Sequence, residues 1–548
     1  TCAAEKRRRR KKGELPTPTK RLFINEAVCE GCGDCGVQSN CTSLLPLETE
    51  FGRKRTIDQS SCNQDYSCVK GFCPSFVTVE GGTPRKSRLA KGAKDSDFAP
   101  LPQPVIPQAS ESTYNILITG IGGTGVITVG ALIGMAAHLE GKGTSALDMT
   151  GMSQKNGAVT SHVRIAKTPD QIRAQRIAAG EADLVLGCDM LTAGAADALG
   201  KTRAGRTVAV INTHQQPTGQ FAQNADWQFP AERIRSLINE AVEDRAHFLD
   251  ATRIATALMG DSIATNLFML GFAFQKGLIP VGEAALMRAI ELNGVAIEAN
   301  KQAFLWGRRA AADLGAVERV TAPAHAVVVK LPETLDKLIA RRVEFLAAYQ
   351  NAAYAKRYSD LVERARAAEA GIGKGDKLTR AVATYLFKLM AYKDEYEVAR
   401  LFSDPSFEER LRKTFDGDFS IRYNLAPPLL AKRDAQGHLT KSEYGAWMKH
   451  AFRLLARLKW LRQTAFDPFG QTQERKTERR LLRDYETTID HCLSALSADN
   501  HDVVLKLASL PEHVRGFGHV KERHIGKYDA DREALLNRLN ISRLVRAA

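Results

Sequence analysis

The sequence predicts a multidomain α/β protein, in which a small cysteine-rich unit precedes a doubly wound α/β domain and an all-helical C-terminal domain. Three observations predict this architecture. Seven cysteines fall between residues 29 and 73, strand and helix patterns alternate from residue 114, and apolar residues keep helical spacing after residue 332. The chain has 548 residues, which is enough for three or four domains.

Residues 1–20 form a basic segment with eight basic and two acidic side chains, in a chain of net charge +15. We interpret its run Lys6–Lys12 as a solvated tail or a strap across an acidic neighbouring domain. An acidic redox partner could also land on it. Nucleic-acid binding is disfavoured, because no aromatic residues are interleaved with the run. The first residue is Thr1 rather than Met, so we expect the chain to be part of a longer polypeptide.

Seven of the ten cysteines lie close together in residues 21–82. They read Cys29-x2-Cys32-x2-Cys35-x5-Cys41 and Cys62-x5-Cys68-x4-Cys73-Pro74. In two-cluster bacterial ferredoxins, three closely spaced cysteines share an iron–sulfur cluster with a distant Cys-Pro. The spacing therefore predicts a ferredoxin-like two-cluster domain, in which one [4Fe–4S] cluster is bound by Cys29, Cys32, Cys35 and Cys73.

The remaining cysteines of this unit, Cys41, Cys62 and Cys68, are left for a second cluster. A complete [4Fe–4S] cluster needs a fourth ligand, and Cys2 is the remaining cysteine nearest in sequence. Asp65 as the fourth ligand and a [3Fe–4S] cluster are the alternatives. A zinc ribbon is disfavoured, because it uses four ligands in two pairs.

Residues 83–112 are expected to be an extended linker. The composition shifts to Gly, Pro, Lys and Ser from residue 81, and prolines follow at Pro100, Pro102, Pro104 and Pro107.

The α/β pattern of residues 113–325 begins with the strand Tyr114–Thr119, a glycine loop and the helix Val126–His138. Further strands are expected at Thr144–Met149, Ala182–Cys188 and Thr207–Ile211, and further helices at Ile263–Phe274 and Glu283–Ala303. Strands that alternate with helices form a mostly parallel, doubly wound sheet. The sequence thus predicts a Rossmann-like domain.

The loop Gly120-Ile121-Gly122-Gly123-Thr124-Gly125 fits the dinucleotide-binding pattern G-x-G-x-x-G, and Asp148 ends the next strand where that fold places its ribose-binding acid. This predicts that Gly120, Gly122, Gly123 and Gly125 bind a cofactor phosphate at the helix N-terminus, as in an NAD site. The alternative is that the glycines allow close packing of strand and helix. The following loop, Gly151–Gly157, is a candidate ligand or interface loop.

Residues 326–548 read as a helical domain. Apolar residues keep helical spacing in three stretches that we expect to be core, which begin at Leu335, Leu378 and Trp447. Cys188 and Cys492 stand alone and are expected to be buried small hydrophobes. The chain lacks an apolar run of about twenty residues and a secretory signal, so we expect a cytoplasmic protein with no membrane span.

Several of these segments resemble the 2-oxoacid:ferredoxin oxidoreductases, and most closely the large, fused indolepyruvate ferredoxin oxidoreductases. The cysteine segment is the most specific part of the resemblance, which covers nearly the whole chain. It is carried by Cys29–Cys35, Glu50–Lys54, Ser61–Cys68, Gly71–Phe76, Asn115–Ile165 and Arg515–Lys521.

The resemblance implies oxidative decarboxylation of an aryl 2-oxoacid, with thiamine diphosphate and Mg as cofactors, coenzyme A as acyl acceptor and ferredoxin as electron acceptor. It also implies that residues 113–325 are a gamma-type domain. Such a domain contacts the thiamine-binding domains near the coenzyme A site and is not an NAD site. An NAD(P)-linked iron–sulfur oxidoreductase and a nucleic-acid-binding iron–sulfur protein that uses Arg7–Arg10 are the lower-ranked alternatives.

The thiamine motif of this family, Gly-Asp-Gly with a downstream Asn, is not found in the chain, and Asp416-Gly417-Asp418 lacks its order. The thiamine-binding domains are therefore expected upstream or on another chain, and no residue here is assigned as catalytic. We expect this chain to be the electron-exit and docking portion of a homodimer or larger complex.

Overall fold

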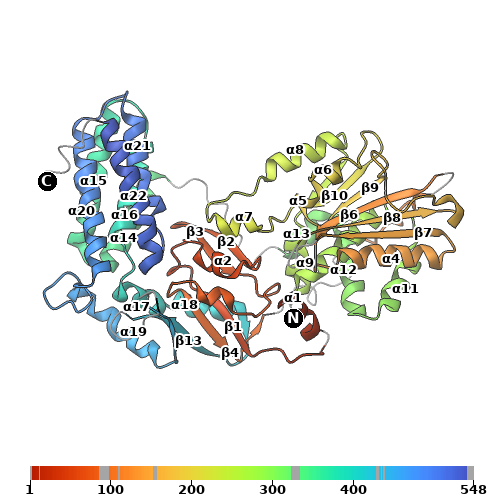
Figure 1. The fold of residues 1–548 in the computed structure, drawn as a ribbon, viewed down its shortest axis with the longest axis horizontal. Helices are drawn as coiled ribbons and strands as arrows, with labels where there is room; N and C mark the ends of the chain where they lie inside the picture. The colour runs from red at the N-terminus through yellow and green to blue at the C-terminus, as the bar shows by residue number, and fades with distance from the viewer. Residues whose placement is uncertain are drawn as a thin grey trace.

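The computed structural model describes residues 3–11, 13–85, 98–108, 112–151, 157–321, 334–427, 431–432, 435 and 439–539. An α/β domain and a bundle of long helices lie on either side of a smaller unit that contains the cysteine-rich segment (Figure 1). Among the described helices, none combines the length and the apolar composition that crossing a membrane requires.

The cysteine-rich unit follows the short basic helix α1 (Ala3–Lys11) and is built on a small antiparallel sheet. Phe23 of its first strand lies opposite Val77 of the strand that follows Cys73. Its elements are β1 (Lys20–Ile24), α2 (Asp34–Ser39), the hairpin of β2 (Leu44–Thr49) and β3 (Gly52–Ile57), the one-turn helix η1 (Ser67–Lys70), β4 (Phe76–Glu80) and β5 (Thr83–Pro84).

The prediction of an all-helical C-terminal domain is wrong at residues 415–444. Strand β13 (Ser420–Leu425) pairs with β4, and β14 (Ser442–Tyr444) extends the same sheet, in the order β1-β4-β13-β14. A further short strand, β12 (Phe415–Asp416), pairs with β5. The apolar residues of β13 alternate with polar ones, which is a strand pattern that lies between two helical stretches. By pairing with β4, this strand satisfies backbone groups that would otherwise form an open sheet edge.

Helices from the C-terminal region complete the core of this unit. They are α17 (Glu395–Ser403), α18 (Pro405–Thr414) and α19 (Met448–Arg457). Phe23 and Val77 from the cysteine-rich strands share one buried cluster with Phe402, Phe407 and Phe452 from these helices. The two segments are about 350 residues apart in sequence, yet they form one core.

One of the three predicted core stripes has the wrong register. In α19 the side chains of Met448 and Phe452 are buried, whereas Trp447 and Leu454 are 61% and 63% exposed. Residues 447 and 454 keep helical spacing, and so do residues 448 and 452. The sequence therefore contains two overlapping apolar stripes, either of which could face the core. Packing against the small sheet selects the second stripe.

The α/β domain contains a six-stranded sheet in the order β11-β10-β9-β6-β8-β7. Its strands are β6 (Tyr114–Ile121), β7 (Gly143–Thr150), β8 (Ala158–Ala166), β9 (Leu184–Gly187), β10 (Val208–Asn212) and β11 (Ala246–Leu249). The four strands from β11 to β6 are parallel, and β8 runs antiparallel to both of its neighbours. The predicted strands are confirmed. The sheet is mixed rather than fully parallel, because the antiparallel strand β8 lies between β6 and β7.

Both faces of this sheet are covered, as the doubly wound prediction requires. Ile116 and Ile118 of β6 point into a core formed with α4 (Val126–Leu139) and with a group of later helices: α9 (Ala251–Met259), α10 (Thr265–Gln275), α11 (Glu283–Asn293), α12 (Ile297–Ala312) and α13 (Leu314–Thr321). Leu117 points to the opposite face. That face is covered by α5 (Met190–Ala193), α6 (Ala196–Leu199) and α8 (Ala231–Ala241). Cys188 is buried in the first core.

The single helix predicted at Glu283–Ala303 is two helices. Gly294 ends α11 in the left-handed conformation, with φ of 69°, and the chain restarts at Ile297. Helix α12 then crosses α10 at very short range. A Cβ atom on Gly271 of α10 would clash with the peptide oxygen of Phe304, and one on Gly307 of α12 with that of Phe268. Glycine at both positions therefore permits this crossing.

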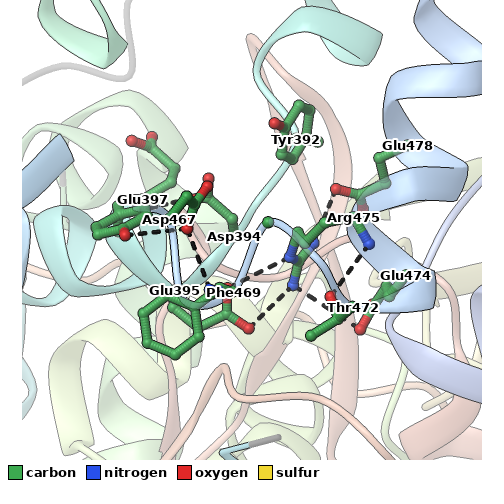
Figure 2. Close-up of polar contacts among 12 residues, drawn as sticks. Tyr392, Asp394, Glu395, Glu397, Asp467, Phe469, Thr472, Glu474, Arg475 and Glu478 are labelled. Carbon is green, nitrogen blue, oxygen red and sulfur yellow. Dashed lines mark hydrogen bonds and ion pairs between the residues drawn. The ribbon is translucent and has the colours of Figure 1, made fainter. Parts of the chain in front are cut away.

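The remaining long helices form the bundle, and Cys492 is buried in its core. Figure 2 shows the ion pairs of Arg475, which join the bundle to α17. Arg475 of α20 contacts Glu395 of α17 at 3.3 Å and Glu478 of its own helix at 2.8 Å. The helices of the bundle are α14 (Leu335–Tyr349), α15 (Ala352–Gly371), α16 (Lys377–Met390), α20 (Gln473–Ser494), α21 (His501–Ser509) and α22 (Gly518–Arg538).

The described second half of the predicted linker, residues 98–108, packs on the α/β domain. The ring of Phe98 lies edge-on to Trp306 with centroids 5.2 Å apart. Gln275 donates a hydrogen bond of 2.6 Å to the peptide oxygen of Pro102. This segment therefore follows the surface of α10 and α12.

Candidate metal centre

Four of the seven clustered cysteines surround one small cavity. Cys29 and Cys32 come from the loop before α2, Cys35 from the first turn of α2, and Cys73 from the turn before β4. Ile24, Phe72 and Phe76 supply the apolar part of the lining. The spacing rule thus grouped the four thiols that the fold brings together.

Glycines shape the loop that carries the first three thiols. Gly31 and Gly33 have φ of 68° and 80°, a region that L side chains rarely adopt. A Cβ on Gly31 would also clash with the peptide oxygen of Arg53 in β3. The loop therefore closes tightly around the cavity, with Cys29 and Cys35 only 6% and 7% exposed.

Burial raises the pKa of the Cys35 thiol well above its ordinary value, and the neighbouring thiols of Cys73, Cys29 and Cys32 raise it further. Burial and Cys73 also raise the pKa of Cys32. Such a set becomes thiolate only when a bound cation compensates the charge. A soft, thiolate-rich, partly apolar cavity fits an iron–sulfur cluster. A site for a single metal ion is a different arrangement. In the described part of the chain, no group of three or more His, Cys, Asp or Glu side chains could hold one.

The other three thiols form a second group. Burial raises the pKa of Cys68, and the nearby Cys62 and Cys41 raise it further, with a smaller contribution from Asp65. Asp65 therefore lies close enough to act on this group, although its carboxylate accepts hydrogen bonds from Ser67 at 3.2 and 2.9 Å. Cys2, the proposed fourth ligand, lies outside the described residues.

The basic helix α1 lies on the loop that carries Cys62. Arg7 donates a hydrogen bond to the peptide oxygen of Ser61, and Arg10 donates one of 2.9 Å to that of Asn63. The guanidinium groups thus contact the peptide oxygens on either side of Cys62. Part of the basic run is used within the chain, as the strap interpretation expects, although its contacts are peptide oxygens rather than acidic side chains.

Two lysines from the C-terminal region reach the loops of the first group. Lys393 donates a hydrogen bond of 3.3 Å to the peptide oxygen of Cys29 and pairs with Glu30. Lys441 donates one of 3.3 Å to that of Cys73 and contacts the peptide oxygen of Gly71. Neither lysine could be predicted from the sequence, because each lies more than 360 residues from its partner and no local pattern marks it.

The cysteine-rich unit also contacts the α/β domain. Arg55 of β3 stacks on the ring of Phe221, 4.3 Å from its centroid, and donates a hydrogen bond of 3.1 Å to the peptide oxygen of Ala225. Arg53 donates one of 2.9 Å to that of Trp227. These partners lie in and just after α7 (Gly219–Gln223), so the cysteine loop is held against the α/β domain.

The glycine loop does not have the surroundings of an NAD site. The backbone N–H of Gly122 is used in a 2.8 Å hydrogen bond to Gly157, and a Cβ on Gly120 would press against Val126. Asp148 lies on β7, and β8 separates that strand from β6. A dinucleotide fold places the acidic strand directly beside the loop strand. The close-packing interpretation explains Gly120, while Gly123 and Gly125 adopt φ of 84° and 98° at the helix start.

A second cavity, of about 590 Å³, opens at the carboxyl ends of β10 and β11. Thr213, His214 and Asp250 line it, together with Leu45 and Pro46 of β2. Ligands of doubly wound folds bind at this edge of the sheet. The candidate loop Gly151–Gly157 is described only at its two ends, since residues 152–156 lie outside the described part.

Residues 115–310 match the family model described as pyruvate ferredoxin/flavodoxin oxidoreductase, and residues 335–534 match a family of unknown function, DUF6537. A relative from Methanothermobacter thermautotrophicus, named indolepyruvate oxidoreductase subunit IorB, is 31% identical over 202 residues. The match covers 36% of this chain and 98% of the relative. The protein of the same name from Pyrococcus horikoshii is 28% identical, with 37% and 97% covered.

A solved structure is also similar: the pyruvate oxidoreductase subunit PORC from Thermotoga maritima is 19% identical, with a TM-score of 0.27 and coverage of 36% of this chain and 96% of that one. The family assignment rests on the curated relatives. Because one of them is at least 30% identical and covered over almost its whole length, the chain belongs to the indolepyruvate oxidoreductase family of enzymes.

Proposed function

We propose that this chain is the electron-transfer and docking portion of a thiamine diphosphate-dependent 2-oxoacid:ferredoxin oxidoreductase of the indolepyruvate type. The enzyme would oxidatively decarboxylate an aryl 2-oxoacid to its acyl-CoA. Its electrons would pass through two clusters in residues 21–82 to ferredoxin.

The observation that carries this proposal is the arrangement of Cys29, Cys32, Cys35 and Cys73 around one buried cavity. Four cysteines from a tight loop and a distant Cys-Pro are the ligand set of a [4Fe–4S] cluster, which supplies one-electron transfer. The second group, Cys41, Cys62 and Cys68, lies in the same small unit. Two clusters in one unit would form a short relay, and α1 lies beside the loop that carries Cys62.

Thiamine diphosphate with Mg and coenzyme A would act through the rest of the enzyme, since no residue of this chain is assigned to the chemistry of decarboxylation. The thiamine-binding domains would lie upstream or on another chain, in a homodimer or a larger complex. The α/β domain, which matches the oxidoreductase family model, supports a docking role. The cavity at the carboxyl ends of β10 and β11 is the part of this domain that we expect near the coenzyme.

The test is a metal and sulfide analysis of anaerobically purified chain. Two [4Fe–4S] clusters predict about eight iron and eight acid-labile sulfide per chain, and a [3Fe–4S] second cluster predicts about seven iron. A colourless protein that binds zinc and no sulfide would contradict the proposal.

A further inference from the structure

The C-terminal region supplies a cation to the first cysteine group by a defined structural route. Strand β4 begins at Phe76, shortly after Cys73, and pairs with β13, with Tyr423 opposite Val77. Strand β14 then pairs with β13, with Ser442 opposite Leu425. This register brings Lys441, the residue before β14, to the turn that carries Cys73.

Lys441 is held at that turn by its surroundings. Its ammonium group donates hydrogen bonds to the peptide oxygens of Gly71 and Cys73. It also lies 5.3 Å from the centroid of the Phe76 ring, which lines the cavity of the first group. Burial lowers the pKa of Lys441, and the nearby thiols of Cys73, Cys35 and Cys68 oppose that shift.

The two lysines near the first group differ in how far nearby carboxylates neutralise their positive charge. Lys393 is paired with the carboxylate of Glu30. Among the described residues, Lys441 has no carboxylate within ion-pair distance, although Asp34 acts on it from farther away. Within the described part of the chain, the charge of Lys441 is therefore the less compensated of the two, and its partial burial reduces screening by salt.

We propose that Lys441 is a positioning residue that raises the reduction potential of the cluster bound by Cys29, Cys32, Cys35 and Cys73. The inference rests on the proposed function. Reduction adds one negative charge to a cluster, and a fixed cation next to its ligands stabilises that form. Net charge and hydrogen bonds around the ligands are the means by which proteins set cluster potentials. The region that matches DUF6537 would thereby tune the electron relay as well as complete its fold.

The experiment is a redox titration of the full chain, in which electron paramagnetic resonance reports the midpoint potential of each cluster. In Lys441→Gln, the potential of the first cluster should shift to more negative values, and that of the second should shift less. Lys441→Arg keeps the charge and should stay close to the unmodified chain. Lys449→Gln is the matched control, because it removes the same charge from an ion pair with Glu408 and should leave both potentials unchanged.

An unchanged potential in Lys441→Gln, with its iron content intact, would overturn the inference. If Lys441→Gln loses iron, the Lys441→Arg variant distinguishes charge from shape. Retained iron and an unchanged potential in Lys441→Arg would support a role for the charge. Lost iron in Lys441→Arg would show that the shape of lysine matters rather than its charge, and would overturn the inference. A chain without clusters in its unmodified form would instead overturn the proposed function.

Discussion

Arg462 and Asp394 form a buried two-point ion pair, with nitrogen–oxygen distances of 2.6 and 2.9 Å and side chains 2% and 3% exposed. Arg462 also donates a hydrogen bond of 2.6 Å to the peptide oxygen of Tyr349 at the end of α14. Asp394 directly follows Lys393, which contacts the Cys29 loop. The pair therefore fixes the segment that connects the helical bundle to the candidate metal centre.

Arg462→Met should destabilise the chain by roughly 3–5 kcal/mol, because it leaves the Asp394 carboxylate buried and without its partner. Urea denaturation followed by circular dichroism measures the change in the free energy of unfolding. Arg364→Met is the control: it breaks an exposed pair with Asp490, whose side chains are 54% and 48% exposed, and should cost less than about 1 kcal/mol. Equal losses in the two variants would show that the Arg462 pair has no special weight.

Cys32→Ala should remove the iron of the first cluster and its paramagnetic signal while the second cluster remains, because three ligands then face the first cavity instead of four. Iron analysis and electron paramagnetic resonance check this. Cys188→Ala removes a buried thiol from the α/β core and should leave the iron content unchanged. Unaltered spectra in Cys32→Ala would refute the ligand assignment.

Gly271→Ala should destabilise the α/β domain by about 1–3 kcal/mol, or more if the helices cannot separate. Its new methyl group would meet the peptide oxygen of Phe304, and a backbone atom cannot rotate away. Gly134→Ala in α4 is the matched control, since its Cβ would lie at an ordinary 3.5 Å from the Thr144 hydroxyl. There the better helix propensity of alanine should raise the melting temperature slightly. A neutral Gly271→Ala would mean that α10 and α12 cross less closely.

Glu369 should make part of the stability of the bundle depend on pH. Burial raises the pKa of this carboxyl, but hydrogen bonds from the Thr379 and Leu378 backbone and from His501 outweigh it and leave the pKa below the usual 4.5. A lowered folded-state pKa contributes stability above about pH 4.5, and this contribution is lost as the pH falls through the folded value.

Glu369→Gln should therefore lower the melting temperature at pH 7, and the gap to the unmodified chain should narrow toward pH 4 and below. Glu363→Gln is the control. Glu363 lies on the same helix with its side chain 53% exposed, so this substitution should leave the melting temperature unchanged at either pH. A gap for Glu369→Gln that stays constant with pH would argue against stabilisation of the ionised carboxyl.

The sequence predicted the local features because their causes are local. Cysteine spacing grouped the four thiols of the first cavity, and a short apolar run followed by the glycine loop located strand β6 and helix α4. The short strand β13 was missed although its period-two pattern is present, because helical stretches lie on both sides of it. The register of α19 was also missed, since only the partner surface chooses between two overlapping stripes.

By itself, the sequence determined the glycine turns and the alternation of strands and helices, because chain geometry within a few residues decides both. It predicted the two cysteine groups from the ligand spacing of two-cluster ferredoxins. The tertiary structure alone placed β8 between β6 and β7, which removes Asp148 from the glycine loop. It alone brought Lys441 to Cys73. Both outcomes depend on pairing between segments distant in sequence, and the free energy of such pairing comes from the assembled sheet and its core rather than from any local pattern.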